Sequence, residues 1–209
     1  MLVRDLGLKD YEEVWTLQRR LVFERASGDA QDVVLLCQHP EVYTIGRSSK
    51  QAIPKGLPYP VHKAERGGDM TYHGPGQLVG YPILKLSDHG LRPRSYLAAL
   101  EAVLIEAVRP FGVEAGVVKG FTGLWVGSKK LASIGVAVRG GVSYHGFALN
   151  VNNSLAPFRL IHPCRLESDV MTSMQRVLRK PVDEHELSQA VGRTMLEYFG
   201  RISGSGGAS

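Results

Sequence analysis

The sequence predicts an α+β fold, in which a mixed or antiparallel sheet is covered by packed helices. Three observations lead to this prediction. Apolar residues recur at helical spacing in two long segments, short apolar runs of strand type lie between them, and most connections are short and contain glycine or proline. This order of helices and hairpin-connected strands is typical of a sheet with helices packed on it.

The first predicted element is a helix over residues 9–26. Val14, Leu17 and Leu21 fall on one face of this helix, as expected for a side that packs against a core. Gly28 follows the last turn and is placed to end it.

Strand-type segments come next. Residues 33–37 and 42–45 are short apolar runs, and residues 77–86 are rich in residues that favour strands. Residues 47–60 are polar, contain proline and glycine, and are predicted to form a loop. A second long helix is predicted over residues 95–109, where leucines recur at helical spacing.

Four further strands are predicted in the centre of the chain, at residues 113–118, 123–126, 131–138 and 142–151. Short glycine-containing turns join the last three of them. These turns predict that the last three strands form an antiparallel meander.

The C-terminal region is predicted to be helical. Residues 168–179 favour a short helix, and Asp183 with Glu186 resembles a capping box for a last helix that runs through Phe199. Residues 201–209 consist largely of glycine and serine and have the composition of a disordered tail.

The chain has 209 residues and no internal repeat or linker-like segment. We therefore expect residues 1–200 to form one domain, with residues 168–200 as its helical C-terminal part. Hydrophobic residues make up 44% and charged residues 22%, the net charge is +5, and the pI is about 9.3.

This positive charge favours acidic partners, but without a dense lysine and arginine run it does not indicate nucleic-acid binding. No apolar run is long enough to span a bilayer and no signal peptide is apparent. We therefore expect a cytoplasmic protein that does not bind membranes.

Residues 66–77 read RGGDMTYHGPGQ and combine four glycines with an arginine, a tyrosine and a histidine. Glycine permits close backbone approach to a ligand, so the segment is a candidate binding wall. The alternative is a pair of tight turns flanking an ordinary strand. Neither a Walker-type phosphate loop nor a dinucleotide fingerprint is present.

Cys164 is the better candidate for a reactive thiol. It follows Pro163 and has Arg165 and possibly His162 as basic neighbours, which would favour the thiolate. The alternative is an inert cysteine. Cys37 lies within an apolar run and is expected to be a core residue, and we expect both thiols to be reduced.

Lys130 is a second candidate for chemistry. It precedes a small-residue segment, Leu-Ala-Ser-Ile-Gly, along which a ligand could lie against the backbone. A lysine entering such a site could lower the pKa of a thiol and carry protons. Its neighbour Lys129 is expected to be a solvated turn residue.

No metal or cofactor is expected. The pairs Cys37/His39 and His162/Cys164 do not have the spacing of zinc ligands. The histidines that could line a site, or serve as hydrogen-bonded structural imidazoles, are His39, His73 and His145.

Five segments together resemble the lipoyl(octanoyl) transferase family. They are RGGxxTYHGPGQxxxY at residues 66–81, HPxxYTxGR at 39–47, KLASIGV at 130–136, GFALNVN at 146–152, and the Pro-Cys pair at 163–164. The chain departs from the family at Arg165, where glycine is usual, and at His162, where asparagine is common. Both departures flank the cysteine and bear on its pKa or on the local turn.

The resemblance implies the fold shared by biotin and lipoate ligases, and the transfer of an octanoyl group to lipoyl domains without a cofactor or metal. Cys164 would be the nucleophile and Lys130 its partner. The substrate-binding residues carried over by motif are Arg66, Gly67, Gly68, Asp69, Met70, Thr71, Tyr72, His73, Ser133, Ile134, Gly135, Gly146, Phe147 and Ala148.

The implied donor is octanoyl-acyl carrier protein. The implied acceptors are the lipoyl domains of 2-oxoacid dehydrogenase E2 subunits and the glycine cleavage H protein. We expect the enzyme to act as a monomer.

Three alternatives remain open from sequence. An ATP-dependent lipoate or biotin ligase would share the fold but need no nucleophilic cysteine. An amidotransferase would move the acyl group between two lipoyl domains through the same cysteine. A basic binding module would have no catalytic activity at all.

Overall fold

A computed structural model describes residues 1–161 and 169–204. A seven-stranded main sheet forms the centre of the protein. Its strands, in spatial order, are β1 (Leu2–Leu8), β2 (Val33–Gln38), β6 (Gln77–Ile83), β10 (Val142–Asn150), β9 (Lys129–Arg139), β8 (Phe121–Val126) and β7 (Gly116–Val118). Only β1 and β2 pair in parallel, and the other neighbours are antiparallel.

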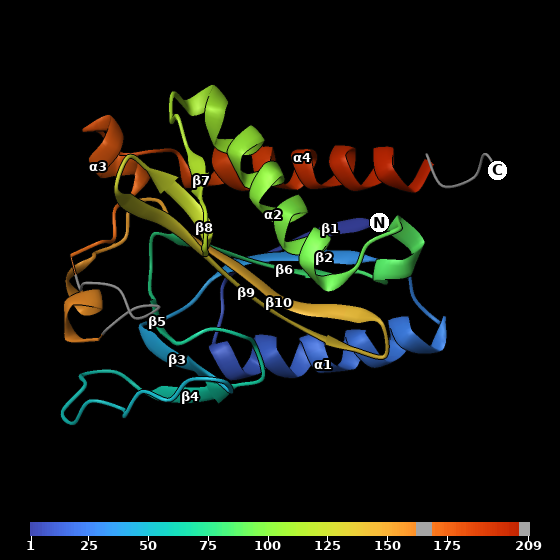
Figure 1. The fold of residues 1–209 in the computed structure, drawn as a ribbon, viewed down its shortest axis with the longest axis horizontal. Helices are drawn as coiled ribbons and strands as arrows, with labels where there is room; N and C mark the ends of the chain where they lie inside the picture. The colour runs from blue at the N-terminus through green and yellow to red at the C-terminus, as the bar shows by residue number, and fades with distance from the viewer. Residues whose placement is uncertain (162–168, 205–209) are drawn as a thin grey trace.

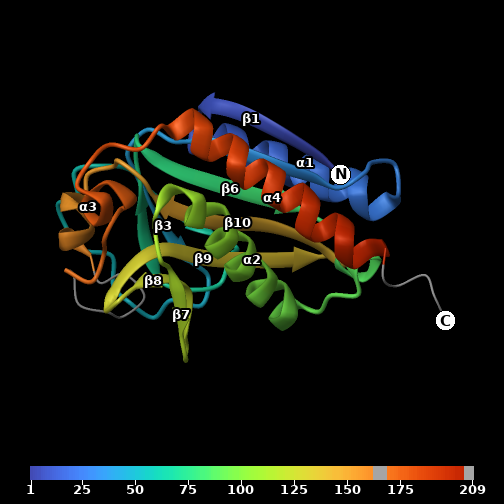
Figure 2. The same cartoon turned by 90° about the horizontal axis from the view of Figure 1, so that it is seen from above.

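A smaller sheet has the order β4 (Val61–Ala64), β3 (Val42–Gly46) and β5 (Met70–His73). Helices α2 (Pro93–Val108) and α4 (Glu184–Gly204) cover one face of the main sheet, and α1 (Tyr11–Ser27) covers the other (Figures 1 and 2). The small sheet lies beside the start of α1, where His62 Nδ1 is 3.1 Å from Glu12 Oε1.

The remaining helical elements are short. They are α3 (Met174–Leu178) and the 3-10 turns η1 (Leu86–His89), η2 (Arg109–Phe111) and η3 (Ala156–Leu160). Among the described residues, no helix combines the length and apolar character that crossing a membrane would require.

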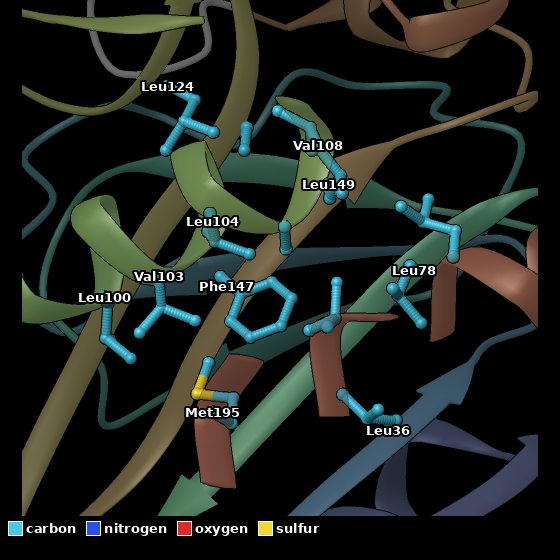
Figure 3. Packing of buried hydrophobic residues seen from close by; sticks show 14 of the residues in the cluster. Leu36, Leu78, Leu100, Val103, Leu104, Val108, Leu124, Phe147, Leu149 and Met195 are labelled. Atoms are coloured by element: carbon cyan, nitrogen blue, oxygen red, sulfur yellow. The ribbon is translucent and has the colours of Figure 1, made fainter. Parts of the chain in front are cut away.

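Strand β2 is buried on both faces, which explains why its sequence is a continuous apolar run. Val34 and Leu36 pack into the core under α2 and α4, whereas Leu35 and Cys37 pack under α1. Figure 3 shows the first of these cores, in which Phe147 and Met195 lie among leucines and valines of the sheet and of α2.

Local sequence signals account for the long helices. Asp10 caps α1 by accepting hydrogen bonds from the N–H groups of Glu12 and Glu13, and Gly28 ends it in the left-handed conformation with φ of 89°. Helix α2 begins two residues before the predicted position, with Pro93 in its first turn. The predicted meander is confirmed, since β8, β9 and β10 are successive antiparallel neighbours.

Three strands were missed, and the bounds of the helices differ in places. β1, β4 and β5 have little local strand pattern and are held by pairing with distant segments. The helix predicted over residues 168–179 is confined to Met174–Leu178, because residues 170–172 are extended and pair with Lys130.

The last helix does not end at Phe199 but continues to Gly204, so residues 201–204 are not a disordered tail. Ser203 Oγ lies 2.7 Å from His89 Nδ1 and donates to the carbonyl of Phe199, and Ile202 packs against the core under α4. His89 in turn lies 2.6 Å from Asp32 Oδ2. These tertiary contacts hold a turn whose composition favours disorder.

This arrangement predicts different stabilities for two truncated chains. A chain that ends at Gly200 should have an unfolding free energy about 1–3 kcal/mol lower than a chain that ends at Gly204, through the lost hydrogen bond and apolar contact. Urea unfolding of both chains would measure this difference. Equal midpoints for both truncated chains would show that the last turn contributes nothing.

Candidate active site

A cavity with an empty volume of about 480 Å³ lies between the small sheet and the middle of the main sheet. The three predicted wall segments, at residues 66–73, 133–135 and 146–148, meet there although they are far apart in sequence. The lining residues are Tyr11, Arg66, Gly67, Gly68, Asp69, Thr71, His73, Val79, Tyr81, Ser133, Ile134, Gly135, His145, Gly146, Phe147 and Ala148.

Met70 and Tyr72 are the two predicted binding residues that do not line the cavity. Side chains alternate between the faces of a strand, so β5 directs Thr71 and His73 to the cavity and the other two to the opposite side. There Met70 and Tyr72 pack in a third core, where Tyr72 and Phe158 meet edge to face. The expectation that these two side chains contact substrate is therefore not supported by the geometry.

The guanidinium of Arg66 holds the glycine-rich wall in place. Nη2 donates to the carbonyl and the hydroxyl of Thr44, both at 2.8 Å, and Nη1 donates to the carbonyls of Gly67 and Asp69. Arg66 is only 9% exposed, so these hydrogen bonds replace those it would make to water. The arginine thus fixes the wall to strand β3.

Glycines allow this wall to approach β3 and β9 closely. A Cβ on Gly46 would lie 2.0 Å from the carbonyl oxygen of Gly68, and one on Gly135 would lie 3.0 Å from that of Gly67. The N–H of Gly67 also donates to the carbonyl of Val136. Close backbone contact, rather than loop flexibility, is the reason that glycine is required at these positions.

His73 is a neutral, buried imidazole. Burial is the largest of the effects that lower its pKa to about 3. Its Nδ1 lies 2.8 Å from Oε1 of Gln77, and its Nε2 lies 3.2 Å from the hydroxyl of Thr44. Because Gln77 uses its NH₂ group to donate elsewhere, Oε1 accepts from His73, and this pattern assigns the ring proton to Nδ1.

The same chain of hydrogen bonds continues to Lys130, at the start of β9. Gln77 Nε2 donates to Asn150 Oδ1, and Asn150 Nδ2 donates to the carbonyl of Thr172. The N–H of Thr172 donates to the carbonyl of Lys130, and the N–H of Lys130 donates to the carbonyl of Val170. One buried network therefore connects the glycine-rich wall with the backbone of Lys130.

Lys130 is 2% exposed, whereas the adjacent Lys129 is largely exposed and pairs with Asp169 at 3.0 Å. The side chain of Lys130 passes Gly123, whose Cβ would lie 3.0 Å from Lys130 Cε, and its Nζ lies 5.5 Å from the ring centre of Trp125. Lys130 does not line the 480 Å³ cavity but lies on the same strand as Ser133.

The predicted nucleophile Cys164 and its neighbours His162 and Arg165 lie outside the described residues. Cys37 is a core residue, as expected, and burial raises the pKa of its thiol. Within residues 1–161 and 169–204, no group of three or more histidine, cysteine or acidic side chains is arranged to hold a metal ion.

His145, one of the histidines expected to line a site, does line the cavity, whereas three cavity residues were not predicted: Tyr11, Val79 and Tyr81. Tyr81 belongs to the glycine-rich motif, and its hydroxyl lies 2.8 Å from His39 Nε2, which places His39 behind the wall. The ring of Tyr11 is stacked on that of His73 at 6.1 Å. Nothing in the local sequence of α1 indicates this role for Tyr11.

The cavity combines an apolar surface with a few polar groups. Val79, Phe147 and Ala148 supply apolar surface, and the buried hydroxyl of Ser133 has no hydrogen-bond partner among the described residues. Such a site suits a ligand with an aliphatic chain and a polar end.

Comparison with known proteins places the chain in a family. Residues 10–196 match the lipoyl protein ligase A/B catalytic domain. The octanoyltransferase of Geobacter metallireducens is 45% identical over 193 residues, covering 91% of this chain and 90% of that protein. A probable octanoyltransferase of Pyrobaculum calidifontis is 47% identical over 173 residues, covering 83% of this chain and 74% of that protein.

Solved structures confirm the predicted fold. A lipoate-protein ligase A bound with ATP has a TM-score of 0.71 at 15% identity, covering 98% of this chain and 92% of that one. The biotin protein ligase of Aquifex aeolicus has a TM-score of 0.58 at 13% identity, covering 98% and 71%. These likenesses concern the fold alone.

The buried imidazoles predict a loss of stability in acid. Burial is the main cause that lowers the pKa of His73 to about 3 and that of His145 to about 4, while an unfolded chain protonates both groups below about 6.5. Their contribution is therefore complete above pH 6.5 and declines as the pH falls towards the folded values. His73→Asn should reduce the slope of unfolding free energy against pH by up to about 1.4 kcal/mol per unit in this window.

The matched control is His185→Asn, at an exposed position on α4. Urea unfolding at several pH values between 4 and 7.5 would provide the slopes. The prediction is wrong if His73→Asn and wild type have the same slope, or if the control changes it equally.

Proposed function

The chain belongs to the octanoyltransferase family of lipoyl protein ligase A/B catalytic domains, and from this premise we propose that it transfers an octanoyl group from octanoyl-acyl carrier protein to a lysine of a lipoyl domain. The main support is the convergence of residues 66–73, 133–135 and 146–148 on one partly apolar cavity. Lys130, on the strand that supplies residues 133–135, would act beside Cys164.

In the first step of this proposal, the thiolate of Cys164 attacks the carbonyl carbon of the octanoyl thioester. The carbon–sulfur bond to the carrier breaks and a thioester to Cys164 forms. The leaving carrier sulfur takes a proton from the Lys130 ammonium and departs as a thiol, which leaves Lys130 neutral for the second step. A free thiol has a pKa of about 8.5, so a nearby ammonium is needed for a useful thiolate fraction at neutral pH. We assign that role to Lys130. One thioester replaces another, and no ATP is consumed.

In the second step, the amine of the acceptor lysine attacks the acyl-enzyme, and an amide forms as Cys164 leaves as a thiolate. The acceptor amine has a reference pKa of about 10.4 and must lose a proton before it attacks. Lys130 in its neutral form is our candidate for the base. Backbone N–H groups of the glycine-rich wall would stabilise the negative oxygen of the tetrahedral intermediate.

The cavity would hold the aliphatic chain of the acyl group. Burial of one CH₂ group contributes about 0.8 kcal/mol, so such a cavity would distinguish neighbouring chain lengths only modestly. The proposed polar contacts come from the glycine-rich wall and from Ser133, whose buried hydroxyl has no hydrogen-bond partner in the part of the chain that the structure describes. Arg66 and His73 would act indirectly, since both are already engaged with protein atoms.

Donor preference separates this proposal from its alternatives. A lipoate or biotin ligase would use the free acid with ATP, and an amidotransferase would take the octanoyl group from another lipoyl domain. The chain's relatives at 45–47% identity are octanoyltransferases, so we favour the thioester donor. E2 subunits and the H protein as acceptors, the monomeric state and the cytoplasmic location remain predictions.

Intact-protein mass would test the acyl-enzyme directly. Mixing the chain with octanoyl-acyl carrier protein should add the mass of one octanoyl group, and Cys164→Ala should abolish this addition. Cys37→Ala is the matched control and should still acquire the group, because Cys37 is buried in the core under α1. Absence of the adduct on wild type, or its presence on Cys164→Ala, would contradict the mechanism.

The role of Lys130 predicts a change in thiol reactivity. Without its positive charge the thiolate of Cys164 is less stabilised, so Lys130→Met should shift the alkylation profile of Cys164 to higher pH. Lys129→Met is the control and should leave the profile unchanged, because the Lys129 side chain is directed to Asp169. Peptide mass after iodoacetamide treatment would give both profiles. Identical profiles for wild type and folded Lys130→Met would refute this role.

A further inference from the structure

A second hollow, with an empty volume of about 980 Å³, lies on the surface between η3 and α3. It does not share any residue with the cavity described above. Three arginines line it: Arg159 from η3, Arg176 from α3, and Arg179 at the end of α3. All three are exposed, so their guanidinium groups are accessible to a partner.

The positive charge of this hollow is only partly offset within the described part of the chain. None of the three arginines forms an ion pair there, whereas Arg20 and Arg201 on other surfaces pair with glutamates. The neighbouring carboxylates have other partners. Asp169 pairs with Lys129, and the more distant charge of Arg159 also helps to lower the pKa of its carboxyl. Glu184 accepts hydrogen bonds from Gln38 and Asn152.

Hydrogen bonds connect the floor of the hollow with strand β10 and with the network of the candidate active site. Asn153 donates to Asn150 Oδ1, and the N–H of Gln175 donates to the carbonyl of Val151. A smaller adjoining hollow shares Arg159 and Arg176 and is also lined by Thr172, whose N–H donates to the carbonyl of Lys130. Arg159 and Arg176 therefore lie near the start of β9, which carries Lys130.

We propose that this arginine-lined hollow is the docking site of the acidic acyl carrier protein, with the phosphodiester of its thioester arm bound by the guanidinium groups. The inference rests on the proposed function and specifies where its donor binds. Planar guanidinium groups bind phosphate oxygens in a bidentate manner, and a phosphodiester is the anion that such a carrier brings close to the reacting thioester.

The charge also distinguishes the donor from the acceptor. A lipoyl domain presents a lysine ammonium at the point of reaction, and three exposed arginines would repel that group. The donor presents an uncharged acyl chain behind an anionic arm, which the same arginines attract. Both partners have an acidic surface, but only the donor arm carries a phosphodiester.

Direct binding provides a test that does not depend on catalysis. Calorimetric titration of the Cys164→Ala chain with octanoyl-acyl carrier protein at low ionic strength should show binding. Adding Arg159→Glu, Arg176→Glu and Arg179→Glu together should weaken it by about tenfold to hundredfold, with reduced salt dependence. Arg193→Glu, at an exposed position of α4 outside the hollow, is the control and should leave affinity unchanged.

The same variants would then be titrated with an apo lipoyl domain, whose affinity should change less than twofold. Equal carrier affinity for wild type and triple variant would overturn the proposal, as would a selective loss of lipoyl-domain affinity. The kinetic counterpart uses octanoyl-pantetheine, which lacks the phosphate. The triple variant should raise KM for the carrier donor and leave kcat/KM for octanoyl-pantetheine unchanged.

The transfer mechanism and the docking site can be refuted separately. Carrier binding that depends on the three arginines, without any acylation of Cys164 in the wild-type chain, would refute the transfer mechanism and support the docking site. Acylation of Cys164 with unchanged affinity and KM in the triple variant would support the mechanism and refute the docking site.

Discussion

The candidate site depends on the buried side chain of Gln77. Its side-chain oxygen accepts a hydrogen bond from His73, and its NH₂ group donates to the backbone carbonyl of Tyr72 and to Asn150. Both the oxygen and the nitrogen of its amide are therefore hydrogen-bonded. These partners belong to the small sheet and the main sheet, and Asn150 leads on to Thr172 and Lys130. Loss of one partner would leave buried polar groups without hydrogen bonds, which costs more than the bond itself contributes. The network therefore fixes the two sheets and the start of β9 relative to one another.

Close backbone contact and strand alternation determine which side chains reach the cavity. Gly80 leaves space for the ring of Phe147, since a Cβ there would lie 2.1 Å from a ring carbon. Alternation along β5 gives Thr71 and His73 to the cavity and Tyr72 to a core. The same sequence motif thus contains residues that face the site and residues that support it, and the motif alone does not separate the two.

Charge is distributed in a way that suits acyl transfer from a carrier. The cavity is lined by two imidazoles, His73 and His145, whose burial lowers their pKa and keeps them neutral, and by the apolar side chains of Val79, Phe147 and Ala148. The guanidinium of Arg66, which also lines it, is hydrogen-bonded to backbone carbonyls. Exposed positive charge lies at the second hollow, on three arginines. The apolar surface of the cavity favours the aliphatic group and the arginine-lined hollow favours an anionic carrier, so each region serves a different part of the proposed donor.

The sequence by itself determined the long helices and the meander of β8, β9 and β10, because periodicity, capping residues and turn residues are local signals. The three segments that line the cavity were identified through the family resemblance of their motifs. The sequence missed β1, the length of α4 and the extended pairing of residues 170–172 with Lys130. It also could not divide residues 66–73 between cavity and core or identify Tyr11 as a wall residue. Those features are decided by pairing and packing between distant segments, whose hydrogen bonds and buried contacts outweigh weak local preferences. Only the tertiary structure brings those segments together.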